Sequence, residues 1–531
     1  MARLLTNCRP AARLAFFAGA LAIAGCGGSG AGGGAGAAAG TSGGGGAQAG
    51  AGGGSGGVGG ASGGGAAGDG AAGGAGTGGG AGSAIGAAGA SGGAGTGGSA
   101  ETGGSAGGGA GSGGAAGSGG AAGGSAGRGG AGGAGGRGGA IAGSGGAGGS
   151  AGGAGGSISH AADAAYCAQQ LTQAASDFTR FRTTYTNATQ IPRSAQNGTV
   201  RLVATSDWTS GFPAGSFWLL YERTKDQAWR TAAETWTAAL MSQQTRTDTH
   251  DVGFIIGTSY GNGYRLTQNV AYKPVLITAA GSLATRFNAT VGCTRSWDFG
   301  TWMFPVIIDN MMNLELLFRG TALGGDARYA QDAVTHALTT RANHFRADYS
   351  SYHLVDYNPT TGAVIKKQTN QGLSDESDWA RGQAWGLYGF TMSYRESGDA
   401  RFLDQATHIA DFYTTSSRMP ADGVPYFDFD AIIRDDVPDY RDASAGAIAA
   451  SGLFELAGYE TGATAENHRA FAIKVVRSLS STAYRAATGT NNQFLLMHSV
   501  GNYPANDEID VAINYADYYY LQALGRCADL Q

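Results

Sequence analysis

The sequence predicts an all-α domain built as a closed ring of helical hairpins, with a small β-hairpin on its rim and a disordered Gly-rich tether in front. Three observations lead to this prediction. Most of the 99 Gly residues in the 531-residue chain lie before Ser157. From His160 to Gln531 the composition is globular, and helix–turn–helix patterns recur there. One stretch, residues 352–365, has strand character instead.

The N-terminal residues 1–26 have the pattern of a bacterial lipoprotein signal. A basic start precedes a short apolar run, residues 14–23, which is too short for a good membrane span. The following Ala24-Gly25-Cys26 resembles a lipobox, in which cleavage precedes a lipidated Cys, so Cys26 is the predicted lipidation site. The alternative is an ordinary secretory signal that contains a Cys. The predicted location is therefore the bacterial cell envelope, lipid-anchored at the outer membrane or cell surface, or the exterior.

The next segment, residues 27–159, consists almost entirely of Gly, Ala and Ser and has no aromatic residue. Such a segment has too little apolar surface to offset the entropy lost on ordering, so it is predicted to be a disordered linker. The formal net charge of the chain is −5 and there is no long basic run, which argues against nucleic acid as the main partner.

Residues 160–531 are predicted to form one domain of helical hairpins. In each pattern a helix ends with aromatic and charged residues, a short polar turn follows, and a second helix begins. The four copies are residues 221–229, 323–329, 394–402 and 459–467. Short turns between helices make antiparallel pairs, and repeated pairs favour an inner ring of helices packed by an outer ring. An irregular helical domain is the alternative.

Residues 352–365 contain two β-rich runs around Asn358-Pro359, the pattern of a β-hairpin. In a helical ring this hairpin would lie on the rim.

Three cysteines follow the signal. Cys167 and Cys527 stand near the two ends of the globular part, and in an oxidising compartment they could form a disulfide that closes the domain, leaving Cys293 free. The chain has no C-x-x-C pair, and its eight His residues show no metal-ligand spacing, so neither a metal nor a cofactor is expected.

Two carboxylates lie in apolar sequence surroundings. Asp251 precedes Val252-Gly253-Phe254, and Asp309 stands between Ile308 and Asn310-Met311. Burial raises the pKa of a carboxyl, which is how an Asp becomes a general acid near neutral pH. The alternative for each is a helix N-cap. Two such residues together favour a glycosidase-like pair.

A further candidate group lies on a helix predicted to begin near Trp379. Arg381 and Trp385 are four residues apart and therefore share one helix face. A guanidinium can bind a carboxylate through two hydrogen bonds, and a flat ring can cover a sugar face, so the pair suits a sugar acid. The alternative is a buried Arg paired to Asp375 or Asp378. His353, in the β-hairpin, is a further candidate for catalysis or substrate contact.

Several sequence blocks, in order, resemble the unsaturated glucuronyl hydrolases, family 88 of the glycoside hydrolases. The blocks are Asp207-Trp208-Thr209-Ser210-Gly211-Phe212, His250-Asp251-Val252-Gly253-Phe254, Arg295-Ser296-Trp297, Ile308-Asp309-Asn310-Met311-Met312-Asn313-Leu314, Trp379-Ala380-Arg381-Gly382-Gln383-Ala384-Trp385-Gly386, Asp442-Ala443-Ser444-Ala445-Gly446-Ala447 and Glu508-Ile509-Asp510-Val511. The resemblance covers the globular part and none of the linker.

The resemblance implies an (α/α)6 barrel that acts on oligosaccharides whose non-reducing end is a 4,5-unsaturated uronic acid. The family hydrates the C4=C5 double bond. The resemblance makes Asp309 the general acid and base and Asp251 its essential partner. The implied substrate contacts are Trp208, His250, His353, Gln371, Arg381, Trp385 and, as a weaker match, His498.

The predicted function is thus removal of the unsaturated uronic acid from lyase-generated oligosaccharides. Two alternatives stay open: an unsaturated rhamnogalacturonyl hydrolase acting on pectin fragments, and a surface carbohydrate-binding protein without turnover. A Ser-x-Ser-x-Lys pattern, which some members use to bind sulfate, is not found near the C-terminus, so the preference for sulfated substrates stays open.

Overall fold

The structure is a computed structural model that describes residues 159–531. The predictions for the signal, for Cys26 and for residues 27–158 fall outside the described residues. Between Ser159 and Gln531, no helix is both long enough and apolar enough to cross a membrane.

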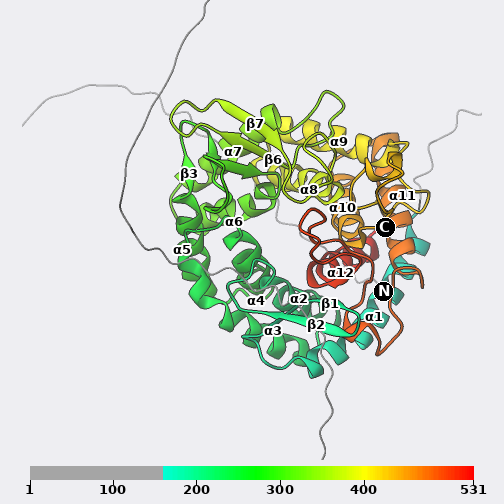
Figure 1. Ribbon diagram of the computed structural model, residues 1–531. Helices are drawn as coiled ribbons and strands as arrows, with labels where there is room; N and C mark the ends of the chain where they lie inside the picture. The colour runs from blue at the N-terminus through cyan, green and yellow to red at the C-terminus, as the bar shows by residue number, and fades with distance from the viewer. Residues whose placement is uncertain (1–158) are drawn as a thin grey trace, which may run out of the picture. The chain divides into compact units, whose positions relative to one another are not determined.

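The most buried helices contact one another in a closed series. In order around the centre of Figure 1, each contacts the next and the last contacts the first. They are α2 (Gly211–Thr224), η2 (Gly253–Gly261), α6 (Asn310–Ala322), α8 (Ala380–Ser397), α10 (Ala443–Leu456) and α12 (Asn514–Ala528).

A second set of helices packs outside this series, each against one or two of its members. These are α1 (Ala161–Thr184), α3 (Gln227–Ala239), α5 (Tyr272–Ala284), α7 (Arg328–Asn343), α9 (Ala400–Thr415) and α11 (Gly462–Leu479). The remaining short helices are η1 (Met241–Thr245), α4 (Asn262–Thr267), η3 (Ala431–Ile433) and η4 (Asn491–Gln493).

All four predicted helix–turn–helix patterns are confirmed as α2–α3, α6–α7, α8–α9 and α10–α11. The turns are set by local chemistry. The side chains of Asp226 and Asp399 cap α3 and α9 by accepting a backbone N–H two residues later. Lys225 and Gly398 end the preceding helices in the left-handed conformation.

Glycines allow the inner helices to approach closely. A Cβ on Gly389 of α8 would lie 2.4 Å from the Met311 side chain on α6. A Cβ on Gly452 of α10 would lie 2.8 Å from Leu387 on α8. Both distances are too short for a real contact, so a larger residue would push these helices apart.

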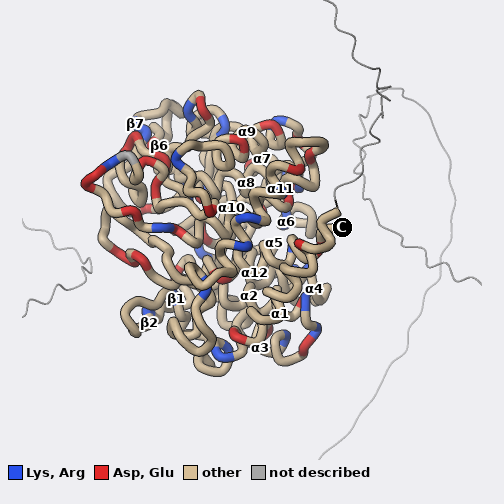
Figure 2. The backbone as a smooth tube through the Cα atoms, turned by 90° about the vertical axis from the view of Figure 1, so that its right-hand side faces the viewer, with Lys and Arg blue, Asp and Glu red and all other residues tan. Residues whose placement is uncertain are grey.

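The strands form three small sheets. The strands are β1 (Ile191–Gln196), β2 (Thr199–Val203), β3 (Phe287–Asn288), β4 (Cys293–Thr294), β5 (Pro305–Ile307), β6 (Leu354–Tyr357), β7 (Val364–Gln368) and β8 (Ala512–Ile513). The strands labelled in Figure 2 belong to two of these sheets and lie at one end of the helices (left). The predicted β-hairpin is confirmed as the antiparallel pair β6–β7. The expectation of a single hairpin was incomplete, because β5 joins it and two further sheets exist.

A disulfide joins Cys167 of α1 to Cys527 of α12, with a Cα–Cα distance of 5.8 Å. Cys293 is free and buried. The bridge that the sequence left open is therefore present, and it links the first outer helix to the last inner helix.

Candidate active site

Three of the predicted site residues, Asp309, Arg381 and Trp385, lie where inner helices begin. Asp309 occupies the N-cap position of α6, Trp379 that of α8 and Asp442 that of α10. Arg381 and Trp385 lie in the first two turns of α8. Helix N-termini carry partial positive charge, so their convergence favours an anionic ligand.

Asp309 is 6% exposed and its side chain makes no capping hydrogen bond, which removes the N-cap as the reason for a carboxyl at this position. Its Oδ2 is buried and has no hydrogen-bond partner. Burial raises the pKa of Asp309 to about 7; the nearby charge of Asp251 adds to this, whereas Arg381 and Trp385 oppose it. A carboxyl with this pKa can both give and take a proton at neutral pH.

His353 faces Asp309 from the start of β6. Its Nδ1 accepts hydrogen bonds from the backbone N–H groups of Asn370 and Gln371, at 2.9 and 3.3 Å. The ring proton is therefore on Nε2, which lies 3.8 Å from Asp309 Oδ2, too far for a hydrogen bond. Burial lowers the pKa of His353 well below its usual value, with help from the charge of Arg381, so the ring is neutral.

Asp251 and His250 precede η2, a π-helix, a rare form that often marks functional sites. Asp251 accepts a hydrogen bond from Thr249 Oγ1 at 2.7 Å, and its other oxygen lies 3.3 Å from His250 Nε2. Burial lowers the pKa of His250. The side chain of Asp251 keeps 20% of its surface exposed, so a ligand can reach it.

Asn313 of α6 connects the segment of His250 to the backbone of Asp309, a role that the sequence did not reveal. Its Nδ2 donates to His250 Nδ1 at 3.2 Å and to the backbone oxygen of Asp309 at 3.3 Å, while its Oδ1 accepts from Phe254 N at 2.7 Å. Asn313 stands in a sequence block quoted above, but an amide on a helix gives no signal of its tertiary partners.

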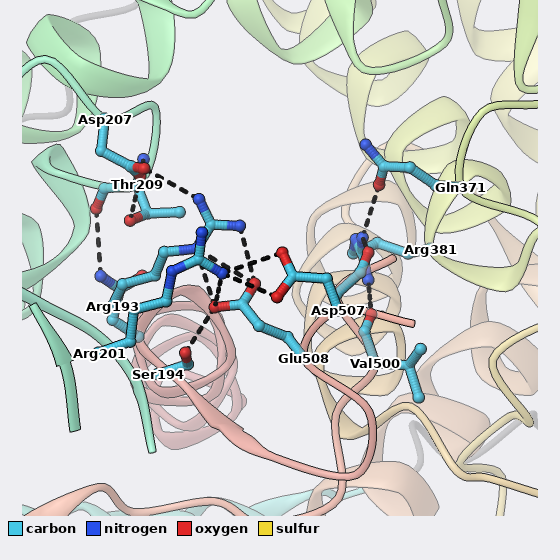
Figure 3. Close-up of polar contacts among 12 residues, drawn as sticks. Arg193, Ser194, Arg201, Asp207, Thr209, Gln371, Arg381, Val500, Asp507 and Glu508 are labelled. Atoms are coloured by element: carbon cyan, nitrogen blue, oxygen red, sulfur yellow. Dashed lines mark hydrogen bonds and ion pairs between the residues drawn. The ribbon is translucent and has the colours of Figure 1, made fainter. Parts of the chain in front are cut away.

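Arg381 is 1% exposed, and both of its terminal nitrogens already bind protein oxygens (Figure 3). Nη1 donates to Asp442 Oδ2 at 3.1 Å and to the backbone oxygen of Val500, and Nη2 donates to Gln371 Oε1 at 2.8 Å and to Gly501 O at 2.6 Å. The Arg is therefore buried and ion-paired, but to Asp442. A two-bond contact with a ligand carboxylate would have to replace some of these bonds.

One of these bonds orients Gln371. Because Arg381 binds its Oε1, the amide nitrogen of Gln371 is directed away from Arg381 and can donate to a ligand (Figure 3). Gln371 and Arg381, which the sequence names as two separate substrate contacts, are thus in direct contact in the structure.

Trp208 and Trp385 are connected through one aromatic ring. Trp208 lies 5.5 Å from Phe254, centroid to centroid, and Phe254 lies 5.2 Å from Trp385. Trp385 is fully buried and its indole N–H has no partner. Trp208 is partly exposed and also packs on Tyr515 at 5.0 Å. Together these rings form an apolar wall beside Asp309.

A buried ion pair connects this wall to the segment around Val500 and Gly501, whose backbone oxygens bind Arg381. Glu508 accepts hydrogen bonds from Arg193 Nε and Nη2, at 2.9 and 2.7 Å, and Arg193 Nη1 donates to Asp207, the neighbour of Trp208, at 2.9 Å (Figure 3). A β-bulge at Arg193 and a left-handed backbone at Glu508 place the two side chains. Glu508 stands in a sequence block quoted above, but nothing in the sequence indicates that it pairs with Arg193.

The structure places His498 elsewhere. It pairs with Asp510 at 2.6 Å and lines a separate cavity of about 500 Å³ with Gln196, Tyr440 and Asn506. Among the described residues, none of the group around Asp309 lines this cavity.

The opposite ends of the inner helices enclose a cavity of about 320 Å³. Its charged wall residues are Arg223, Arg265, Arg319, Arg395, Arg526, Glu222 and Glu315. Each of these Arg side chains contacts a carboxylate, so the positive charge is already balanced. Asp309 and His353, whose side chains have unpartnered polar atoms, lie at the other end of the inner helices, and we place the candidate active site there.

From Ser159 onwards, no cluster of His, Cys, Asp and Glu is arranged to hold a metal ion. A buried carboxyl of pKa about 7 beside a second carboxylate, with aromatic walls, is an arrangement for acid–base cleavage of sugars. The fold and the site therefore define a helical glycosidase.

Comparison with known proteins agrees. The model of Glycosyl Hydrolase Family 88 matches residues 182–524. The chain is 47% identical over 334 residues to an unsaturated glucuronyl hydrolase of Formosa agariphila, covering 62% of this chain and 82% of that protein. The chain belongs to glycosyl hydrolase family 88.

Solved structures show the same relationship. An unsaturated glucuronyl hydrolase specific for heparin matches with a TM-score of 0.64 and 46% identity, covering 70% of this chain and 97% of that one. A variant of the enzyme from Streptococcus agalactiae, complexed with dGlcA-GalNAc6S, matches with a TM-score of 0.59 and 29% identity, covering 68% and 91%.

Proposed function

We propose that the protein removes a 4,5-unsaturated uronic acid from the non-reducing end of oligosaccharides by hydrating its C4=C5 double bond. The observation that carries the proposal is the Asp309 carboxyl. It is buried, has a pKa of about 7 and leaves Oδ2 unpartnered beside the unpartnered N–H groups of His353 and Trp385. A ligand that enters here can complete the hydrogen bonds of these atoms.

In this mechanism Asp309 transfers its proton to C4 of the sugar. A water molecule attacks C5 and gives a proton back to Asp309, so the carboxyl is regenerated. The product of this hydration is a hemiketal at C5. It opens, and the remaining sugar is expelled from C1.

The other residues hold the sugar and tune the acid. Asp251 and His250 lie where they can bind sugar hydroxyls, and the charge of Asp251 helps to keep Asp309 protonated. Trp208, which is partly exposed, covers the ring, and the buried Trp385 supports it through Phe254. Gln371 offers its amide nitrogen to the sugar carboxylate, and Arg381 acts through its charge and by holding Gln371 in place. His498, in its separate cavity, has no role in this mechanism.

The substrate class follows from the relatives. Proteins similar to this chain carry names that include chondroitin disaccharides and heparin. We therefore propose fragments of glycosaminoglycans or of related uronate polysaccharides as substrates. The closed series of inner helices supports the (α/α)6 barrel that the family resemblance implies.

The proposed location is the bacterial cell envelope, with a lipid on Cys26 and residues 27–159 as a flexible tether. The disulfide between Cys167 and Cys527 supports an oxidising compartment. Mass spectrometry of the mature protein tests the anchor. Acyl mass on Cys26 is expected, and its absence from wild-type protein rejects the anchor.

The function is tested with lyase-generated disaccharides, by following the loss of ultraviolet absorbance from the conjugated double bond. Loss is expected on glycosaminoglycan-type fragments. Loss on unsaturated rhamnogalacturonan fragments alone would favour the pectin-degrading alternative. If no fragment of either kind, nor of xanthan or gellan, loses absorbance, the protein is not this enzyme.

A further inference from the structure

Residues 369–378, between β7 and α8, present two groups of the candidate active site. The backbone N–H groups of Asn370 and Gln371 donate to His353 Nδ1 at 2.9 and 3.3 Å, and the side chain of Gln371 contacts Arg381 at 2.8 Å. We call residues 369–378 the clamp loop. The direction of the His353 N–H group and of the Gln371 amide therefore depends on where the clamp loop lies.

A buried carboxylate outside the group around Asp309 holds the clamp loop. Asp428 is fully buried, and its Oδ2 accepts hydrogen bonds from Leu373 N at 2.9 Å and from Ser377 Oγ at 2.7 Å. Its Oδ1 accepts from Asp430 N at 3.0 Å. A buried carboxylate that loses such donors costs free energy, so these bonds keep the loop in place.

The clamp loop packs directly on this carboxylate at Gly372, the residue after Gln371. A Cβ on Gly372 would lie 3.1 Å from Asp428 Oδ2 and 2.9 Å from both Thr369 Oγ1 and Trp379 Cβ. These distances are shorter than ordinary contacts, so no side chain fits between the loop and Asp428.

The backbone of Asp428 is also fixed to the start of α8. Asp428 forms an antiparallel β-bridge with Trp379, the N-cap residue of that helix. The Trp379 ring lies 4.6 Å from the His353 ring, centroid to centroid, and 4.4 Å from the guanidinium carbon of Arg381. The residue that holds the clamp loop is thus in register with a ring that contacts both His353 and Arg381.

The clamp loop has a second, exposed support. Asp375 accepts a hydrogen bond from Thr369 N at 3.1 Å and pairs with Lys366 at 2.6 Å. The side chains of Asp375 and Lys366 are 40% and 57% exposed, and exposed pairs contribute little free energy. Asp428 is therefore the buried support of the loop.

We propose that Asp428 is a positioning residue for the hydration reaction. By holding the clamp loop, it keeps the His353 N–H group directed towards Asp309 and the amide nitrogen of Gln371 directed towards the sugar carboxylate. Asp428 itself does not contact the substrate. This inference rests on the proposed function, because the roles of His353 and Gln371 do.

Kinetics on a lyase-generated disaccharide give the first test. Asp428→Ala removes both acceptor bonds to the clamp loop, so KM should rise about tenfold, with a smaller fall in kcat because Asp309 is unchanged. Ser377→Ala removes one of the two bonds and should raise KM by a smaller factor.

Two conservative variants are the kinetic controls. Asp428→Asn can keep its amide oxygen towards Leu373 and Ser377 and give up only the bond from Asp430, so its KM should stay near the wild-type value. Asp375→Asn, in the exposed support, should change KM less than about twofold.

The tautomer of His353 gives a measurement that needs no turnover. In wild-type protein, the nitrogen chemical shifts of isotope-labelled His353, assigned with His353→Gln, should show one tautomer, with its proton on Nε2. Asp428→Ala should show both tautomers, because the loop N–H groups no longer hold Nδ1 in place. A role limited to stability would lower the melting temperature without changing the tautomer.

Asp517→Asn is the control for lost stability. Asp517 is 1% exposed and accepts hydrogen bonds from the backbone N–H groups of Leu495 and Leu496, both at 2.9 Å. This substitution also disturbs a buried carboxylate that binds two donors, but it should leave the His353 signals unchanged.

An unchanged KM together with a single His353 tautomer in Asp428→Ala overturns the proposal. An equal change of tautomer in Asp517→Asn overturns it as well. If Asp428→Ala does not fold, the same two measurements on Ser377→Ala decide. If wild-type protein hydrolyses no disaccharide, the proposed function fails, and the tautomer measurement still decides whether Asp428 positions His353.

Discussion

At the scale of single residues, position 309 combines burial with an incomplete hydrogen-bond shell. Asn has nearly the shape of Asp but cannot transfer the proton, so Asp309→Asn should lower kcat by about 10²–10⁴-fold. Circular dichroism should be unchanged. Asp404→Asn, at a half-exposed carboxyl on α9, is the matched control and should retain activity. Near wild-type turnover by Asp309→Asn would assign the acid–base role to another group.

The pKa of about 7 at Asp309 predicts a pH dependence of activity. The proposed mechanism needs the protonated acid, which is present below the pKa and is lost above it. We therefore expect kcat/KM to fall as the pH rises through about 7. Initial rates in buffers of constant ionic strength measure this. A profile that rises through neutral pH would contradict the assignment.

The same pKa also affects stability. The folded-state pKa lies above the unfolded value, so the folded protein holds the proton more tightly between about pH 4 and 7, and stability from this group is lost as the pH rises through that window. Asn carries no charge at any pH. The unfolding free energy of Asp309→Asn minus that of the wild type should therefore increase by on the order of 4 kcal/mol between about pH 4 and pH 8. Denaturant titrations measure it, and a gain independent of pH would contradict the raised pKa.

At the scale of elements, residues 499–511 fold back on themselves, and the carbonyl groups at 500 and 501 hold Arg381. Glu508 ties this segment to Arg193 of β1. Glu508→Gln removes the more buried of the two carboxylates that Arg193 binds and leaves only Asp207, so it should destabilise the protein by about 2 kcal/mol. KM should rise several-fold with a smaller change in kcat, because Arg381 and Trp208 lose their support.

The matched control for Glu508→Gln lies one residue away. Asp507 pairs with Arg201 at 2.9 Å, but both side chains are almost half exposed. Exposed pairs contribute little, so Asp507→Asn should cost less than about 1 kcal/mol and leave KM unchanged. Thermal melts and initial-rate kinetics on both variants give the comparison. Equal effects of the two substitutions would mean that burial of the pair has no special role.

The helical hairpins were predictable because their signals are local: a turn residue, a capping Asp and an apolar helix face on each side. Interactions between distant segments were not. Arg381 pairs with Asp442, 61 positions later, rather than with the nearby Asp375 or Asp378. Arg193 and Glu508 are 315 positions apart. The motif blocks located Asp309 and Asp251. Neither spacing nor composition indicates that the backbone oxygens of Val500 and Gly501 accept hydrogen bonds from the guanidinium of Arg381.

At the scale of the whole described domain, one covalent bond joins segments 360 positions apart. Closing a long loop removes entropy from the unfolded chain, so Cys167→Ser with Cys527→Ser should lower the unfolding free energy by about 4 kcal/mol. Activity at room temperature should persist, because neither Cys contacts the site. Thermal melts with and without reductant measure the effect, and equal midpoints would show that the bridge does not stabilise the fold.

The position of the Cys167–Cys527 bridge also has a mechanical consequence. Cys167 lies near the start of α1, just after the segment that the sequence predicts to be a tether. A force that pulls on the chain in front of α1 would otherwise peel that helix from its neighbours one turn at a time. With the bridge in place, the force passes from Cys167 directly to Cys527 of α12, an inner helix of the domain. The part of α1 that follows Cys167 then carries little of the force.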